Sequence, residues 1–311
     1  MTKSIEDILK KGYGTWRKNI SMGLPFLFCA LSEFLILIAS LIISIIILGF
    51  TIGFVTSIDN PLLKIFIIGI VMISFCTLVI VLLNLTKAFF LGGAVGMART
   101  AIETGNSSLS DMIRYGKSRF KDLFIANMII FAFSIAATLL FIPAVVAFML
   151  NMFNLTISLV IITIVLLSIC QFCITLLFIM LPYSVVIKNL DPVNAVRDNY
   201  RVIMNNKISV LLLFFVSYGV IWGVGLILDL IFSFFGIIPL IGAIINLGIF
   251  ILYALFLIGI VTPLTMVWWV YLYLDRTGIK PAEIPEEIPP EIPAPIAEEQ
   301  IKEEIQGPIY I

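Results

Sequence analysis

Four ionisable side chains stand within or beside long apolar stretches, and they are the residues best suited to chemistry. The acids are Glu33 and Asp229, and the bases nearest to them are Lys87 and Lys64. An ionisable group at membrane depth is costly, so it is a functional candidate by default. We expect Lys87 to reach Glu33, and Lys64 to reach Asp229. These pairs would either lie on a solute path or only stabilise the packing of helices.

Uncharged polar residues occur in or near the same stretches. They are one glutamine and three asparagines, namely Gln171, Asn84, Asn127 and Asn246. Hydrogen bonding between helices is the usual role of such residues, and a solute path is the alternative. They are too few and too scattered along the chain to outline a polar route.

Two cysteines, Cys170 and Cys173, have the C-x-x-C spacing of redox and metal sites. They lie in the middle of an apolar run, and the chain has no second such pair and no histidine. A buried, unreactive pair is therefore expected. The lack of histidine also excludes a Ser-His-Asp triad and histidine-ligated metals or haem. The sequence predicts no catalytic, cofactor-binding or metal-binding residue.

The composition indicates which solvent surrounds these residues. Of the 311 residues, 61% are hydrophobic and 12% are charged, and this charged share is about half that of a soluble domain. A soluble protein of this length has too little interior to bury so many apolar side chains. The solvent must therefore be lipid.

Six apolar runs each exceed the roughly 20 residues that cross a bilayer. They cover about residues 24–56, 62–91, 123–150, 155–187, 208–235 and 240–273. The breaks within successive pairs are short, at 59–61, 151–154 and 236–239. Such short breaks indicate helical hairpins. The sequence predicts an all-α, polytopic integral membrane bundle of six transmembrane helices in three hairpins.

Lysine and arginine predict the orientation of the spans. They are concentrated before the first span, between the second and third, and between the fourth and fifth, whereas the opposite side has only Lys64. We therefore expect a multi-pass protein of the cell membrane with both termini in the cytoplasm.

A short amphipathic segment precedes each hairpin. The segments follow Ser4, Ser108 and Asp191, which are all residues that can cap a helix. Each has an apolar face and a basic face, which is typical of a helix at the cytoplasmic interface. The segments align without gaps and predict three parallel repeats, at about 4–91, 108–187 and 191–274. Alternatively, the pattern is common to any amphipathic linker before a span.

The bases of these segments are the leading functional feature. We call six of them the basic belt: Lys10, Lys11, Arg114, Lys117, Arg197 and Arg201. Together with an inserted apolar face they would bind anionic lipid headgroups or partner proteins, but they would also suffice merely to fix topology. The predicted function is a non-enzymatic membrane module with such partners and no nucleic acid. A transporter for a small solute or lipid, using Glu33 and Asp229, is the alternative, and a membrane-embedded enzyme ranks third.

Small residues and prolines predict how the spans pack and bend. Glycines four residues apart allow close contact of helices, and they occur at Gly49/Gly53, Gly92/Gly96 and Gly219/Gly223. Proline within a span predicts a kink, and it occurs at Pro143, Pro182 and Pro263.

Several short motifs resemble those of known membrane proteins. The stretches GYGTWRKN at 12–19 and GGAVGMA at 92–98 resemble uncharacterised archaeal six-span membrane proteins. The stretch LPY at 181–183, followed by DPVNAV at 191–196, is similar to the membrane domain attached to some glycerophosphodiester phosphodiesterases. The resemblance covers about residues 4–275 and implies a six-helix membrane module without a settled activity. The phosphodiesterase barrel has no counterpart in this sequence, so that activity is not implied.

The last residues differ in composition from the rest. Residues 281–311 hold eight acids and one base, Lys302, and repeat Glu-Ile-Pro three times. Proline at this density favours extended or disordered chain. We expect a membrane domain at 1–278 and a disordered, acidic cytoplasmic tail at 279–311, which could bind a basic protein partner.

Overall fold

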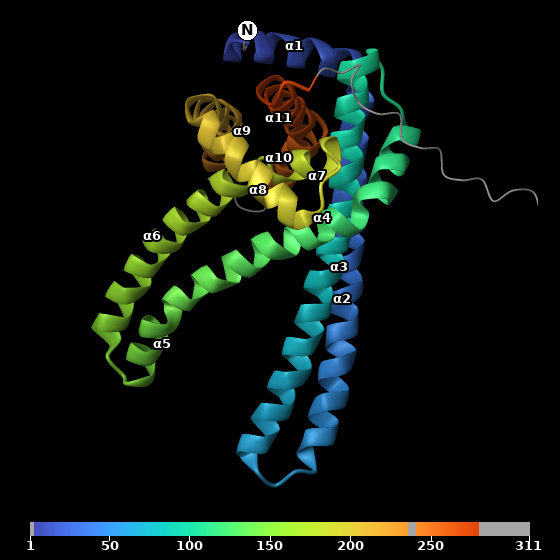
Figure 1. The fold of residues 1–311 in the computed structure, drawn as a ribbon. Helices are drawn as coiled ribbons and strands as arrows, with labels where there is room; N and C mark the ends of the chain where they lie inside the picture. Colours follow the sequence, from blue (N-terminus) through green and yellow to red (C-terminus); the bar gives the residue numbers. More distant parts are fainter. Residues whose placement is uncertain (1–2, 236–240, 280–311) are drawn as a thin grey trace, which may run out of the picture. The chain divides into compact units, whose positions relative to one another are not determined.

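The computed structural model describes residues 3–235 and 241–279, and within these ranges it contains helices and no strand (Figure 1). Six helical stretches there are long and apolar enough to cross a membrane. They are Ile20–Thr56, Pro61–Thr104, Leu109–Met149, Phe153–Ile187, Lys207–Phe234 and Ile244–Thr277. The predicted class, an all-α polytopic membrane bundle, is confirmed.

The six stretches pair into hairpins, as predicted, although the third turn (236–239) lies outside the described residues. The helices of the hairpins are α2 (Leu24–Thr56), α3 (Pro61–Thr104), α4 (Leu109–Thr138), α5 (Ile142–Met149), α6 (Phe153–Phe178), α9 (Lys207–Phe235) and α10 (Ile241–Phe256). The first turn is fixed by Asn60, whose side-chain oxygen accepts hydrogen bonds from the N–H groups of Leu62 and Leu63. This cap satisfies two amides that α3 itself cannot pair.

The three predicted prolines coincide with interruptions of the spans. Pro143, Pro182 and Pro263 each stand in the first turn of a helix, where a missing N–H costs nothing. The short elements at these interruptions are η2 (Leu139–Phe141), α7 (Leu181–Ile187), the π-helical η3 (Leu257–Val261) and α11 (Thr262–Thr277). By contrast, α3 has proline only at its start and runs unbroken for 44 residues.

The predicted caps of the amphipathic segments are present. The side chains of Ser4, Ser108 and Asp191 each accept a hydrogen bond from the N–H group of the third helical residue. Two of these caps begin separate helices of 14 residues each, α1 (Ile5–Lys18) and α8 (Pro192–Asn205). Local sequence therefore sets where these helices begin.

The second amphipathic segment differs from the other two, because it continues into its span as the single helix α4. Helices α1 and α8 both end at an asparagine, Asn19 or Asn206, with φ of −127° and −131°. The corresponding residue in α4 is Leu123, which stays helical and is fully buried. A leucine offers no polar side chain to end the helix here, and burial favours continuing it.

Part of the apolar face of each amphipathic segment packs on protein, although Leu109 and Ile113 of the second segment are exposed. Ile8 of α1 is fully buried, and Trp268 of α11 donates its indole N–H to the Leu9 carbonyl at 3.2 Å. Met112 of α4 and Ala195 of α8 are likewise buried. The expectation that these faces insert into lipid is wrong for these residues, because neighbouring helices already cover them.

The buried core gathers where α3 and α4 cross. A Cβ added to Gly93 would lie 2.6 Å from Cγ of Met112, and one added to Gly92 would lie 2.8 Å from Leu123. A Cβ added to Gly96 would lie closer still to the ring of Tyr115. The predicted close contact at Gly92/Gly96 is therefore confirmed.

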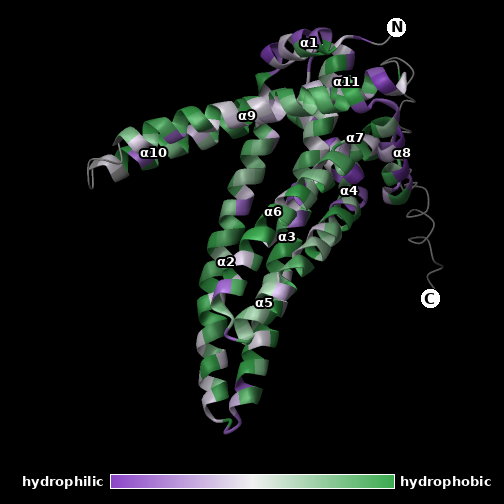
Figure 2. Cartoon of the chain, turned by 90° about the vertical axis from the view of Figure 1, so that its left-hand side faces the viewer, coloured by the Kyte–Doolittle hydropathy of each residue, from purple (hydrophilic) through white to green (hydrophobic). Residues whose placement is uncertain are grey.

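The other two glycine pairs do not mediate close contacts. Among the described residues, a Cβ would meet no atom within 4 Å at any of the four positions Gly49, Gly53, Gly219 and Gly223. The prediction fails there because no neighbouring helix in the described residues packs against these glycines. Figure 2 shows that the spans concerned are largely apolar. Phe50, for example, is 79% exposed, and lipid is the solvent that such a surface requires.

The chain divides into a compact unit, Met1–Gly278, and a second stretch, Ile279–Ile311. The predicted disordered tail lies outside the described residues apart from Ile279. Its disorder and its binding of a partner therefore stay predictions.

Candidate functional site

A groove of about 430 Å³, mostly apolar but with several polar side chains in its lining, lies between α2, α3 and α4. We call it the Glu33 groove. Its polar lining consists of Cys29 and Glu33 from α2, Asn84 and Lys87 from α3, and Asn127 and Ser134 from α4. It thus collects two of the charged residues singled out above, together with two of the asparagines.

Helical spacing explains how the groove acquires its polar lining. Asn84 and Lys87 are three residues apart and Glu33 is four residues after Cys29, so each pair shares one face of its helix. Asn127 and Ser134 are seven residues apart on α4, which is two turns. The close packing of α3 on α4 then brings these faces together.

The structure brings Glu33 and Lys87 together, with Nζ of Lys87 4.0 Å from Oε1 of Glu33. The Glu33 side chain is 27% exposed and that of Lys87 is 56% exposed. The thiol of Cys29 donates a hydrogen bond to the same Glu33 oxygen at 3.4 Å. The two charges are close enough to attract each other but too far apart for a direct hydrogen bond.

Several polar atoms in the groove have unused bonding capacity. The Asn84 amide donates to the Ile80 carbonyl at 2.9 Å, which leaves its oxygen free to accept. Within the described residues the Asn127 side chain forms no hydrogen bond, and Lys87 has only its contact with Glu33. The groove therefore offers unsatisfied donors and acceptors to a ligand.

The lengths of α2 and α3 indicate how deep the groove lies. Counted from the turn that joins α2 to α3, Glu33 is 23 residues along α2 and Lys87 is 26 residues along α3, or about 35 and 39 Å at the helical rise. The hydrocarbon core is about 30 Å thick, and a tilt of about 20° shortens these lengths only slightly. If this turn lies at one boundary of the hydrocarbon, both charges are at the level of the headgroups on the opposite side.

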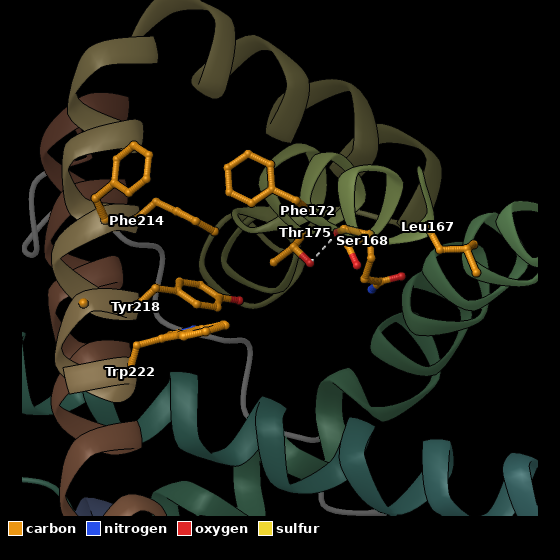
Figure 3. Close-up of a pocket in the computed structure, with 10 residues that line it drawn as sticks. Leu167, Ser168, Phe172, Thr175, Phe214, Tyr218 and Trp222 are labelled. Atoms are coloured by element: carbon orange, nitrogen blue, oxygen red, sulfur yellow. Dashed lines mark hydrogen bonds between the residues drawn. The ribbon is translucent and has the colours of Figure 1, made fainter. Parts of the chain in front are cut away.

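A second groove of about 720 Å³ lies between α6 and α9. We call it the aromatic groove. Figure 3 shows Tyr218 and Trp222 of α9 opposite Thr175 and Ser168 of α6. Gln171 also lines it and is exposed, and its side chain has no hydrogen-bond partner in the described residues. Among the described residues, no charged side chain lines this groove.

The second predicted ion pair, Lys64 with Asp229, is not formed. Neither side chain has an ion-pair partner or a side-chain hydrogen bond within the described ranges. Lys64 stands in the first turn of α3, and Asp229 is exposed and 22 residues along α9, or about 33 Å from its start. Each residue is near the end of its helix that leads to a hairpin turn, and headgroups and water can satisfy a charge there without a protein partner.

The prediction for Asn246 and the prediction for the two central cysteines differ in outcome. The Asn246 amide donates to the Phe232 carbonyl at 3.3 Å, which is the predicted bond between helices. Cys170 and Cys173 are free thiols. Cys173 is exposed, so the prediction of a buried pair is wrong, because α6 turns this face away from its neighbours.

All six side chains of the basic belt belong to exposed residues. Lys10 pairs with Glu6 at 2.6 Å and Arg114 with Asp111 at 3.1 Å. The remaining four have no hydrogen bond or ion pair within the described part of the chain, namely Lys11, Lys117, Arg197 and Arg201. These four are the bases most available to an anion.

A buried cluster around Asp198 of α8 is absent from the sequence-based predictions. Its carboxylate accepts hydrogen bonds from Lys188 at 2.6 Å, from Tyr273 at 2.6 Å and from Ser184 at 3.1 Å. Burial raises the pKa of the Asp198 carboxyl, but these hydrogen bonds outweigh burial and leave the pKa below its usual value. One feature of the sequence could have indicated this cluster. Asp198 is an acid three residues after Ala195, and so lies on the face of α8 that carries this buried alanine.

No three His, Cys, Asp or Glu side chains among the described residues are grouped so that they could hold a metal ion. Comparison of the chain with protein-family models, with curated proteins and with solved structures finds no match. A function for this chain is therefore proposed from its residues and their geometry alone.

Proposed function

We propose that the protein is a non-enzymatic membrane module whose basic belt binds anionic lipid headgroups at the cytoplasmic surface. The observation that carries this proposal is the exposure of all six bases on helical segments that are anchored to the protein by buried residues such as Ile8, Met112 and Ala195. Because α1 and α8 are already folded and docked, binding would order only the side chains. Each base near an anionic surface contributes about 1 kcal/mol.

The proposal includes the orientation and the origin of the belt. We place both termini in the cytoplasm of a cell, because the lysines and arginines are concentrated on one side of the spans. We also propose that the belt arose by internal repetition. The equal lengths of α1 and α8, their matching caps and their asparagine ends support this.

Native mass spectrometry of the full chain tests the belt. The protein would be released from nanodiscs of phosphatidylglycerol and phosphatidylethanolamine, and the retained lipids counted. Replacing Lys11, Lys117 and Arg201 with glutamine should weaken phosphatidylglycerol binding about a hundredfold, at about 1 kcal/mol for each base. Lys64→Gln, at the opposite end of the spans, is the matched control and should change nothing.

Two results would contradict the belt proposal. Unchanged phosphatidylglycerol retention in the triple variant would show that the basic belt does not bind this lipid. Loss of a co-purifying protein instead of a lipid would assign the belt to a protein partner.

A transporter is the second candidate, and the two grooves favour it. The aromatic groove lies between the second span of one hairpin and the first span of the next, and Gln171 lines it. The Glu33 groove lies between both spans of the first hairpin and the first span of the second. This candidate function requires a solute to cross the membrane of vesicles that contain the protein. Uptake that is lost in Glu33→Gln but kept in the belt variant would make transport the favoured function.

A further inference from the structure

We propose that the Glu33 groove binds the headgroup of a zwitterionic aminophospholipid of the inner leaflet. The phosphate would lie against the Lys87 ammonium, and the lipid ammonium against the Glu33 carboxylate. This site is separate from the basic belt, and it takes a different class of lipid.

The spacing of the two charges supports a zwitterionic ligand. At 4.0 Å the pair is partly exposed to the groove and lacks a direct hydrogen bond. A charge at the edge of the hydrocarbon is stabilised when it gains a close, hydrogen-bonded partner of opposite sign. One ligand that carries both signs satisfies Glu33 and Lys87 together and leaves the net charge of the site at zero.

The neutral polar residues match the rest of such a headgroup. The Asn127 amide is free to donate to phosphate or ester oxygens, and the Asn84 oxygen is free to accept from the lipid ammonium. Cys29 already donates to Glu33, which leaves the second carboxylate oxygen available. A small inorganic anion would satisfy only the Lys87 side of this lining.

The surroundings fit the lipid tails. Phe26, Phe90, Ile130 and Phe131 form the apolar part of the groove lining, beside the polar groups. The volume of about 430 Å³ is within the range of about 300–1,000 Å³ that holds small ligands. With the orientation proposed above, and with the turn after α2 at the outer boundary, the two charges are at the level of the inner headgroups, and a lipid can enter sideways from that leaflet.

Competitive lipid retention tests the proposal on the full chain. The probe is native mass spectrometry after release from nanodiscs of equal parts phosphatidylethanolamine and phosphatidylglycerol. We expect Glu33→Gln and Lys87→Met each to reduce phosphatidylethanolamine retention about tenfold, since each removes one charge-assisted hydrogen bond. The matched controls, Asp229→Asn and Lys64→Met, remove unpaired charges of the same kinds and should retain the lipid.

The same experiment separates this site from the belt. The triple belt variant should lose phosphatidylglycerol and keep phosphatidylethanolamine, whereas Glu33→Gln should do the reverse. Full phosphatidylethanolamine retention by folded Glu33→Gln and Lys87→Met would overturn the proposal, even if the belt prediction holds.

A measurement on the wild-type chain covers the case in which the variants fail to fold. Phosphatidylethanolamine with a photoreactive diazirine near the glycerol end of one tail would be crosslinked in vesicles. Labelling of Phe26, Phe90 or Ile130 is the expected result. Labelling confined to other surfaces, including the aromatic groove, would refute the site.

Discussion

At the scale of single residues, one carboxylate links α7, α8 and α11 through hydrogen bonds. Asp198 of α8 accepts hydrogen bonds from Ser184 of α7, from Lys188 directly after α7, and from Tyr273 of α11. Ser184 and Tyr273 are fully buried. Ser184 can also donate to the Met180 carbonyl at 3.3 Å, so removing the carboxylate chiefly costs the Tyr273 hydroxyl its acceptor. Asp198 is therefore a structural residue, although it has the low pKa often found in functional sites.

Asp198→Asn should destabilise the protein by about 1.5–3 kcal/mol at pH 7, the usual effect of losing a hydrogen bond to a charged group. The folded-state pKa of Asp198 is lowered, so its contribution is complete above the unfolded pKa of about 3.9 and is lost as pH falls through the folded pKa. Unfolding in detergent, followed from pH 7 to pH 3, measures both effects.

The comparison for this prediction is Asp229→Asn, which alters an exposed acid without a partner in the described residues. It should leave stability unchanged. If Asp198→Asn had the stability and acid response of the wild type, the cluster would contribute nothing to folding.

At the scale of elements, the contact of α3 with α4 organises the core. Gly92, Gly93 and Gly96 allow the backbones to approach closely, and Met112 and Leu123 fill the space opposite them. The same contact sets the position of Asn127 relative to Lys87, because both helices continue from it into the membrane. Packing here therefore also determines the geometry of the Glu33 groove.

Gly93→Ala should destabilise the protein by about 1–3 kcal/mol, the cost of overfilling a packed core. The new Cβ would lie 2.6 Å from Met112 Cγ and 2.7 Å from the Met112 carbonyl oxygen, and the carbonyl is backbone that cannot move aside cheaply. Denaturant unfolding in micelles measures the change.

Gly49→Ala is the matched control, since nothing lies within 4 Å of its added Cβ. It should be neutral or stabilise α2 by up to about 1 kcal/mol through helix propensity. Equal effects of the two substitutions would show that α3 and α4 are not closely packed.

At the scale of the whole molecule, the distribution of charge predicts the topology. The bases of the belt should be on the cytoplasmic side, and the turns after α2 and α5 on the opposite side. In a variant whose four native cysteines are replaced by serine, a cysteine at Ser57 should react with a membrane-impermeant maleimide added to intact cells. Cysteines at Lys11 or Arg201 should react only after permeabilisation. Labelling of Lys11→Cys in intact cells would show that the orientation is the reverse of the proposed one.

The sequence alone determined the features that depend on composition and local pattern. Six spans followed from the length and apolar character of the runs, and Ser4, Ser108 and Asp191 could be identified as caps because a cap acts within one turn. The proximity of Glu33 and Lys87 was also predictable, because a short turn makes their helices neighbours.

Only the tertiary structure decided which helical faces are covered. The spans are apolar on all sides, so their sequences do not distinguish a face that packs on protein from one that meets lipid. For that reason Gly92/Gly96 and Gly49/Gly53 have the same pattern but different surroundings. The addition of Asn127 to the Glu33 groove depends on contacts between distant segments, which local periodicity does not encode.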